Sequence, residues 1–227
     1  MKEELPDVTF CAFEGIRDRV YDSISCHPDI YFFQIDERTV IHAPGIPEDK
    51  LRILKGSGME LVAGEKDPQG IYPDTARYNA ARVGDVIFHD LEITDPVIID
   101  SARKRGLRTV SVKQGYTRCS LLAANDKALI TSDRGIAEAA ESVGINALFV
   151  SSGAVVLPGE KHGFIGGAGG GISGDKVILL GSLDEHPQKK EIRNFLGRYC
   201  DLLVELEDLP LYDAGSLMCF RTDYTDT

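Results

Sequence analysis

The residues of this chain best suited to covalent chemistry are five cysteines: Cys11, Cys26, Cys119, Cys200 and Cys219. A cysteine thiolate is a strong nucleophile, and a histidine beside it can move protons near neutral pH. The number of cysteines is odd, no two have Cys-x-x-Cys spacing, and the start of the chain lacks the apolar stretch of a signal peptide. We therefore expect reduced thiols, most of them small buried residues, and the question is whether one of them is a nucleophile.

Two other kinds of site are not indicated by the residue spacing. No His-x-x-x-His or comparable pattern is present, so neither a metal nor another cofactor is expected. His42 and His89 end equivalent predicted strands, which favours a structural role for both. The glycine-rich stretch 163–174 lacks the Gly-Lys-Ser/Thr ending of a P-loop and lies between two predicted strands. We interpret it as a flexible hairpin loop rather than a phosphate cradle.

An internal repeat predicts the elements that position these residues. Four times the chain runs through two short apolar strands, a helix and a third strand, over about 31–77, 78–118, 119–161 and 162–215. The matching points His42, His89, Thr131 and Gly181 are about 47, 42 and 50 residues apart. Asn, Asp and Gly occupy the hairpin positions, and Gly follows the helix ends. A period of this length is typical of an array or a propeller.

The repeat also predicts particular elements and a closed ring. Helices are expected at about 47–55, 95–105 and 135–142 and from 187 to just before 199, and the first strand of the fourth unit at 163–166. Further strands are expected at 8–13 and 216–220. If the two chain ends share a blade, the ring closes and no edge is exposed. The prediction is one domain, 1–227: a five-fold pseudosymmetric α/β propeller of ββαβ units whose fifth blade is shared by 1–30 and 216–227.

This layout resembles the pentein fold of guanidino-group modifying enzymes, which includes arginine deiminase and glycine amidinotransferase. The segment from Ser120 to Ile130 is similar to strand pairs of a non-catalytic relative, the ribosome anti-association factor. The segment His162 to Gly171, with the Asp213 to Ser216 approach to Cys219, looks most like a bacterial branch of the fold without an assigned activity. The resemblance in architecture covers nearly the whole chain. It does not determine the activity, because one fold hosts several activities.

The resemblance implies a catalytic pair. Enzymes of this fold attack a guanidinium or amidinium carbon with a cysteine thiolate, and a histidine acts as the general acid and base. Their cysteine follows a Gly-x-x-x-Cys approach, which Gly215 to Cys219 matches, and their histidine opens the preceding unit, where His162 stands. Cys219 and His162 are about one repeat apart, so both are expected to point into the central channel from adjacent blades.

The chain also departs from the family pattern. Ser120 stands where the enzymes carry an acid at the start of the third unit, and Asn79 and Arg82 stand where the acid of the second unit is expected. Arg82 would repel a guanidinium, so a substrate with a carboxylate or a phosphate fits Arg82 and Asn79 better. Asp213 is the carboxylate best placed near the predicted pair. The predicted substrate-binding residues are therefore Asn79, Arg82, Asp213 and Ser120.

Two functions remain open at this stage. One is a Cys-dependent hydrolase or transferase acting on a guanidino- or amidino-type metabolite; the other is a non-catalytic binding or scaffold protein. Lys and Arg number 25 against 36 Asp and Glu, a net charge of −11, which disfavours nucleic acid. No apolar run is long enough for a membrane span. We expect a cytoplasmic protein that binds a small molecule in its channel; the sequence does not predict its oligomeric state.

Overall fold

The computed structural model describes residues 5, 8–172, 176–206 and 209–220. Its regular elements form four successive units, which we number 1 to 4. The strands and α-helices are β1 (Phe32–Gln34), β2 (Thr39–His42), α1 (Glu48–Gly56), β3 (Glu60–Ala63), β4 (Ala81–Val83), β5 (Val86–His89), α2 (Pro96–Lys104), β6 (Arg108–Ser111), α3 (Thr117–Ser120), β7 (Leu121–Asn125), β8 (Ala128–Thr131), α4 (Arg134–Ser142), β9 (Asn146–Phe149), β10 (Gly169–Ile172), β11 (Lys176–Leu179), α5 (Lys189–Tyr199) and β12 (Leu202–Glu205). Short 3₁₀ helices are η1 (Asp22–Ile24), η2 (Pro28–Ile30), η3 (Asp74–Ala76) and η4 (Leu183–Glu185).

All four units have one topology. In each, the first two strands pair antiparallel, and the third strand returns through a helix to lie parallel to the second. The strand orders are β1-β2-β3, β4-β5-β6, β7-β8-β9 and β10-β11-β12. A hairpin suffices for the antiparallel step, whereas the parallel step needs a crossover, which the helix provides. The mixed α/β fold predicted from the sequence is confirmed, and its four three-stranded sheets are consistent with a repeated ββαβ unit.

The second strand of each unit forms its buried centre. Strands β2, β5 and β8 are buried at every position, and β11 at all but Lys176. A central strand buried on both faces requires a continuous apolar run rather than an alternating one, as in Val86–Phe88. Each of helices α1, α2 and α4 is followed by a glycine with positive φ, as at Gly106 with φ 67°, the conformation that ends helices at low steric cost.

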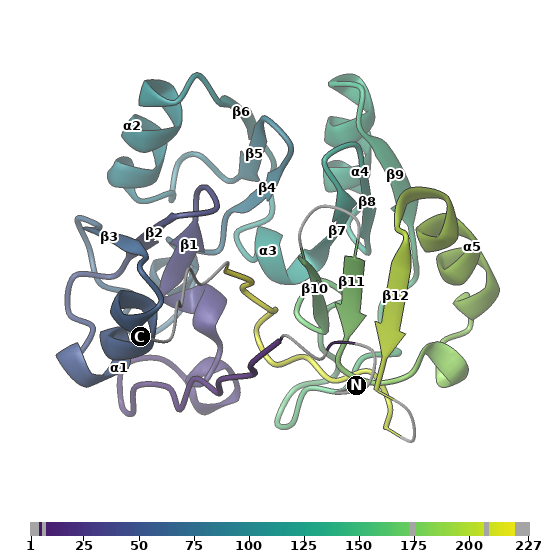
Figure 1. Ribbon diagram of the computed structural model, residues 1–227, viewed down its shortest axis with the longest axis horizontal. Helices are drawn as coiled ribbons and strands as arrows, with labels where there is room; N and C mark the ends of the chain where they lie inside the picture. Colours follow the sequence, from purple (N-terminus) through teal and green to yellow (C-terminus); the bar gives the residue numbers. More distant parts are fainter. Residues whose placement is uncertain (1–4, 6–7, 173–175, 207–208, 221–227) are drawn as a thin grey trace, which may run out of the picture.

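The units follow one another around the middle of the molecule, as Figure 1 shows. Helices α1, α2, α4 and α5 lie at the periphery, and α3 lies near the centre. Segments from both ends of the chain run between units 1 and 4 (Figure 1). One of them, residues 216–219, which we call the C-terminal segment, binds both neighbours: Gln34 Nε2 of β1 donates to the Cys219 carbonyl at 2.9 Å, and Leu217 N donates to the Gly169 carbonyl of β10 at 3.1 Å.

Three predicted strands are wrong. Residues 8–13 form no strand, and Thr9–Ala12 are exposed. Residues 216–220 also form none, and Ser216 at their start has a φ of 68°, outside the range of an extended strand. In unit 4 the first strand is β10, at 169–172, rather than 163–166. The assignment of both chain ends to a shared fifth blade stays a prediction, and residues 1–4, 6–7 and 221–227 of it lie outside the described residues.

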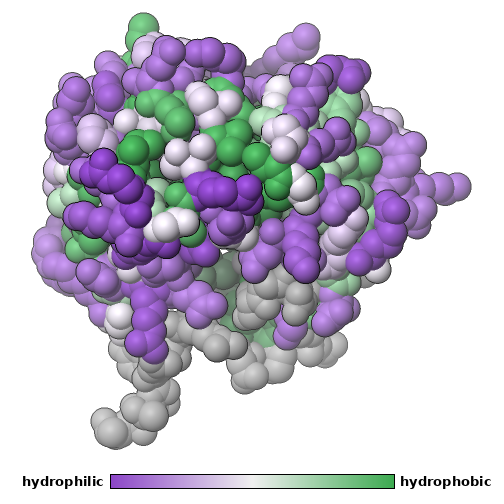
Figure 2. Space-filling view, turned by 90° about the horizontal axis from the view of Figure 1, so that it is seen from above, coloured by the Kyte–Doolittle hydropathy of each residue, from purple (hydrophilic) through white to green (hydrophobic). Residues whose placement is uncertain are grey.

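The surface is polar with apolar areas. Figure 2 shows hydrophobic residues gathered at the middle of one face and hydrophilic residues around them. Across the described residues, no helix combines the length and the apolar composition that crossing a membrane requires.

Candidate functional site

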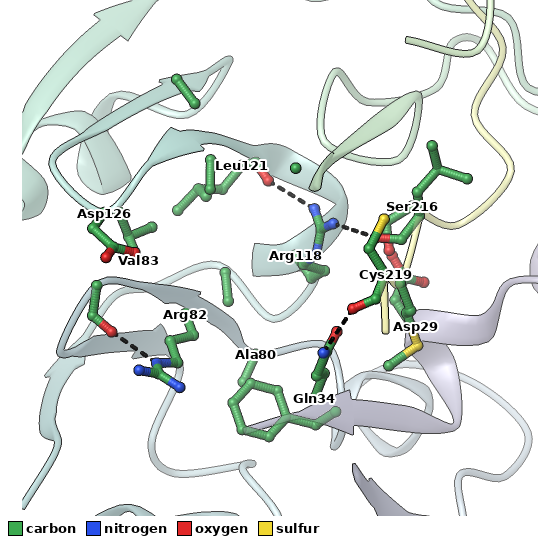
Figure 3. A pocket seen from close by; sticks show the side chains of 18 of the residues that line it. Asp29, Gln34, Ala80, Arg82, Val83, Arg118, Leu121, Asp126, Ser216 and Cys219 are labelled. Atoms are coloured by element: carbon green, nitrogen blue, oxygen red, sulfur yellow. Dashed lines mark hydrogen bonds between the residues drawn. The ribbon is translucent and has the colours of Figure 1, made fainter. Parts of the chain in front are cut away.

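A cavity of about 210 Å³ lies where the first strands of all four units meet the C-terminal segment. Its wall includes residues of β1, β4 and β7, Gly171 of β10, and Ser216–Cys219. Figure 3 shows Arg118, Ser216 and Cys219 at one end and Arg82, Val83 and Asp126 at the other. The repeat therefore converges on one polar cavity of a size suited to a small molecule.

Arg118 places a positive charge in this wall. Its guanidinium donates to four backbone carbonyls: Leu121 at 3.2 Å, Gly166 at 3.3 Å, Gly169 at 3.5 Å and Leu217 at 3.1 Å. None of the described carboxylates forms an ion pair with it. Burial lowers the pKa of Arg118, and nearby acidic groups oppose that effect; an arginine side chain nevertheless stays protonated at neutral pH. The carbonyls orient the guanidinium without neutralising it.

The Cys219 thiol lies beside Arg118 (Figure 3). Burial raises the pKa of Cys219 to about 11, while the positive charge of Arg118 opposes the rise. At neutral pH the thiol is therefore protonated and weakly nucleophilic. His162, the predicted acid and base, is not among the residues that line the cavity. Its Nδ1 lies 3.0 Å from the Gly163 carbonyl and its ring lies edge-on to Phe164.

The predicted substrate-binding residues fall into two groups. Arg82 lines the cavity, where its Nε donates to the Gly84 carbonyl at 2.7 Å and its Nη1 donates to the Ile35 carbonyl. Asn79, Ser120 and Asp213 are all buried and are not part of the lining. Of the six predicted site residues, the structure brings Cys219 and Arg82 to one cavity, at opposite ends of it.

A buried polar cluster, His27, Asp29 and Cys119, adjoins the cavity, and its Asp29 is part of the cavity lining. The Cys119 thiol donates to Asp29 Oδ2 at 3.1 Å, and Asn79 Nδ2 donates to Cys119 Sγ at 3.2 Å. Cys119 N donates to Asn79 Oδ1 at 3.1 Å, so the side-chain amide of Asn79 bonds to both the backbone and the thiol of Cys119. Burial, followed by the charges of Asp29 and Asp213, raises the pKa of Cys119 well above its ordinary value.

Asp213 connects this cluster to the chain end. Its Oδ2 accepts from Phe164 N at 2.9 Å and its Oδ1 from Gly215 N at 3.0 Å, while Oδ1 lies 3.8 Å from His27 Nδ1. Burial raises the pKa of Asp213, and the proximity of His27 opposes that rise. Asp213 thus lies next to His27 and is not part of the cavity lining.

The glycine-rich stretch is a packing element, not the flexible hairpin loop expected from sequence. Residues 165–170 are all buried. A Cβ on Gly167 would lie 1.9 Å from Asp213 Oδ1, and one on Gly166 would lie 2.3 Å from the Arg118 carbonyl. Glycine is required because the backbone must approach the cluster this closely. Residues 173–175 of the stretch lie outside the described residues.

Four residues of the site were not singled out by sequence analysis: His27, Asp29, Arg118 and Gln34. Asp29 and Cys119 are 90 residues apart in the chain and Gln34 and Cys219 are 185 apart, so no local motif marks them. The available signals were the placement of Arg118 and Cys119 at the boundary between the second and third repeats and the density of glycine at 163–171.

A solved structure and a sequence family are similar to this chain. The structure is SxtG, an amidinotransferase from Microseira wollei in the saxitoxin biosynthetic pathway, with a TM-score of 0.45 and 12% identity over 80% of this chain. The chain spans 64% of the length of that one. A search of curated proteins finds no match. The profile of a family of unknown function, DUF6873, matches residues 6–218, and the chain therefore belongs to this family.

Proposed function

We propose that this chain is a pentein-like protein that binds a small, carboxylate-bearing metabolite in its central cavity. The observation that carries the proposal is the pair of cavity arginines, Arg118 and Arg82, whose guanidiniums bond to backbone carbonyls and to no carboxylate among the described residues. Arginine binds carboxylates through paired N–H donors. A cation already oriented by carbonyls loses little side-chain entropy when it binds an anion.

The positions of the two arginines indicate how such a metabolite lies. Arg118 and Arg82 stand at opposite ends of the cavity (Figure 3), so the carboxylate binds at one end while the rest of the molecule extends toward the other. The cavity of about 210 Å³ has room for one small metabolite. A five-bladed ring closed by the chain ends, as the pentein resemblance implies, would enclose this cavity on all sides.

Calorimetric titration with three matched compounds tests this proposal. L-Arginine carries a carboxylate and a guanidinium, agmatine lacks the carboxylate, and L-norvaline lacks the guanidinium. We expect norvaline to bind and agmatine not to bind, and arginine to bind more weakly than norvaline because its guanidinium extends toward the second cavity arginine. Arg82→Met should weaken binding by about tenfold or more, the value of a lost charged hydrogen bond, whereas Arg103→Met, at an exposed arginine of α2, should not change it. Binding of agmatine but not norvaline would contradict the proposal.

A second candidate is Cys-dependent chemistry on an amidino or guanidino carbon, which the position of Cys219 in the same cavity supports. Once the cationic group of the ligand lowers the pKa of the thiol, the Sγ would add to this carbon, and the tetrahedral adduct would expel a protonated amine or ammonia to leave a covalent intermediate that water or a second amine releases. His162 would then shuttle the proton, as the resemblance implies. Cys219→Ala tests the nucleophile and His162→Ala tests the proton transfer. The two variants are needed separately because His162 is not among the residues that line the cavity.

Paired alkylating agents distinguish the two candidates. Chloroacetamidine carries an amidinium next to its reactive carbon, and chloroacetamide is its neutral counterpart. An amidine-directed nucleophile predicts that chloroacetamidine labels Cys219 preferentially, relative to the exposed Cys11 and Cys26, as read by peptide mass spectrometry. If the ratio of the labelling rates with the two agents is the same at all three cysteines, the catalytic candidate is refuted and the binding function stands.

A further inference from the structure

The buried cluster beside the cavity contains three different metal-binding side chains. One donor atom from each of His27, Asp29 and Cys119 lies within 4.8 Å of the other two. Their exposed fractions are 4%, 2% and 3%. They come from distant parts of the chain: His27 and Asp29 flank the first residue of η2, and Cys119 lies in α3. Three donors of this kind seldom meet in a protein interior without a partner, because burial of polar groups is costly.

Independent evidence comes from polar atoms that lack a partner. His27 Nδ1, Asp29 Oδ1 and Ser216 Oγ are buried and form no hydrogen bond with any described residue. His27 and Asp29 are members of the cluster, and Ser216 lines the same cavity as Asp29. The hydrogen bond between Cys119 and Asp29 accounts for one carboxylate oxygen and leaves the other free. A bound cation would be shared by the imidazole and the carboxylate.

We propose that His27, Asp29 and Cys119 bind one divalent transition-metal ion of the zinc class. Imidazole, thiolate and carboxylate together match the ligand preferences of Zn²⁺ and Co²⁺, whereas Mg²⁺ and Ca²⁺ prefer oxygen ligands alone. On binding, Cys119 Sγ gives up its proton to solvent and forms the metal–sulfur bond. Asp213 Oδ1, 3.8 Å from His27 Nδ1, adds a negative charge beside the site without forming a hydrogen bond to the ring.

Three protein ligands leave one position of a tetrahedral ion open, which is typical of sites that bind a substrate or water rather than of purely structural ones. Asp29 and Ser216 both belong to the cavity lining, so the open position faces the cavity. The unpartnered Ser216 hydroxyl lies on that side. This metal site does not depend on the proposed function, because the ion would bind without a metabolite.

Titration of the full chain with Co²⁺, after treatment with a chelator and its removal, tests the proposal. We expect one Co²⁺ per chain, intense visible bands of a tetrahedral ion and a thiolate-to-cobalt charge-transfer band in the near ultraviolet. Added Zn²⁺ should displace the bound Co²⁺ and so remove the visible bands. Cys119→Ser should abolish the charge-transfer band, and His27→Gln or Asp29→Asn should weaken binding by at least about tenfold. Cys26→Ser, at an exposed thiol, should change nothing.

A second variant decides the matter if Cys119→Ser fails to fold. Replacing Cys11, Cys26, Cys200 and Cys219 by serine leaves Cys119 as the sole thiol, and the charge-transfer band should persist in this variant. Loss of the band there, its retention in a folded Cys119→Ser protein, or the absence of Co²⁺ binding to the folded wild-type chain would each overturn the proposal. Circular dichroism establishes folding in every case.

Discussion

The pKa of Cys219 predicts how fast this thiol reacts at each pH. Its pKa is raised from 9.0 to about 11, so at pH 8 the thiolate fraction is about one in a thousand, compared with about one in ten for an ordinary thiol. Alkylation at pH 8 should therefore be about 100-fold slower in the folded chain than in the unfolded one.

Iodoacetamide labelling between pH 7.5 and 10.5 measures this rate, with the Cys219 peptide quantified by mass spectrometry. The same peptide in urea-unfolded protein is the control, since it has the same neighbours in sequence. We expect the folded rate to rise about tenfold per pH unit throughout the range. Restricted access alone would slow labelling without moving its pH dependence. A plateau at or below pH 9 in the folded chain would refute the reasoning.

Other predictions concern stability and follow from single positions. Burial lowers the pKa of His89 to about 4. Between about pH 6.5 and pH 4, His89 is therefore protonated in the unfolded chain and neutral in the folded one. The neutral buried imidazole thus contributes on the order of 3 kcal/mol to the free energy of unfolding, fully above pH 6.5 and progressively less as the pH falls toward 4. In urea unfolding the His89→Gln variant should lack this pH dependence. A free energy of unfolding that depends on pH as in the wild-type chain would contradict the assignment. Gly167→Ala should destabilise the chain by about 1–3 kcal/mol or more, because its Cβ would lie 1.9 Å from Asp213 Oδ1. Gly197→Ala, in α5 where a Cβ meets nothing within 4 Å, should stabilise it by about 0.5–1 kcal/mol in the same assay, and a loss of stability there would argue against an open helix surface.

The repeated unit could be predicted because it depends on local rules. A fully buried second strand needs a continuous apolar run, and the runs at Val40–Ile41 and Leu129–Ile130 supply it between turn residues. The first strand of unit 4 was misplaced because Gly169–Gly171 has no side chains to indicate a strand. That strand forms through its pairing with β11, and glycine is needed because a Cβ on Gly170 would lie 2.6 Å from the Leu217 carbonyl.

The site was predicted less completely, for a physical reason. Cys219 and Arg82 stand at repeat positions that face the centre, and both line the cavity. Arg118 could not be identified, because its role depends on carbonyls of the Gly166–Gly169 region and of Leu217. His27 and Asp29 precede the first repeat and have no counterpart in it. Residues brought together only by packing between distant parts of the chain leave no pattern in a single sequence.

The placement of the C-terminal segment has a consequence for the order of folding. Each ββαβ unit is stabilised by contacts between residues near in sequence, which form quickly, whereas the bond from Gln34 to the Cys219 carbonyl closes a loop of 185 residues. Secondary structure should therefore return early in refolding, and the cavity should form in the last kinetic phase. In stopped-flow experiments, protection of Cys219 from alkylation would lag behind the recovery of far-ultraviolet circular dichroism.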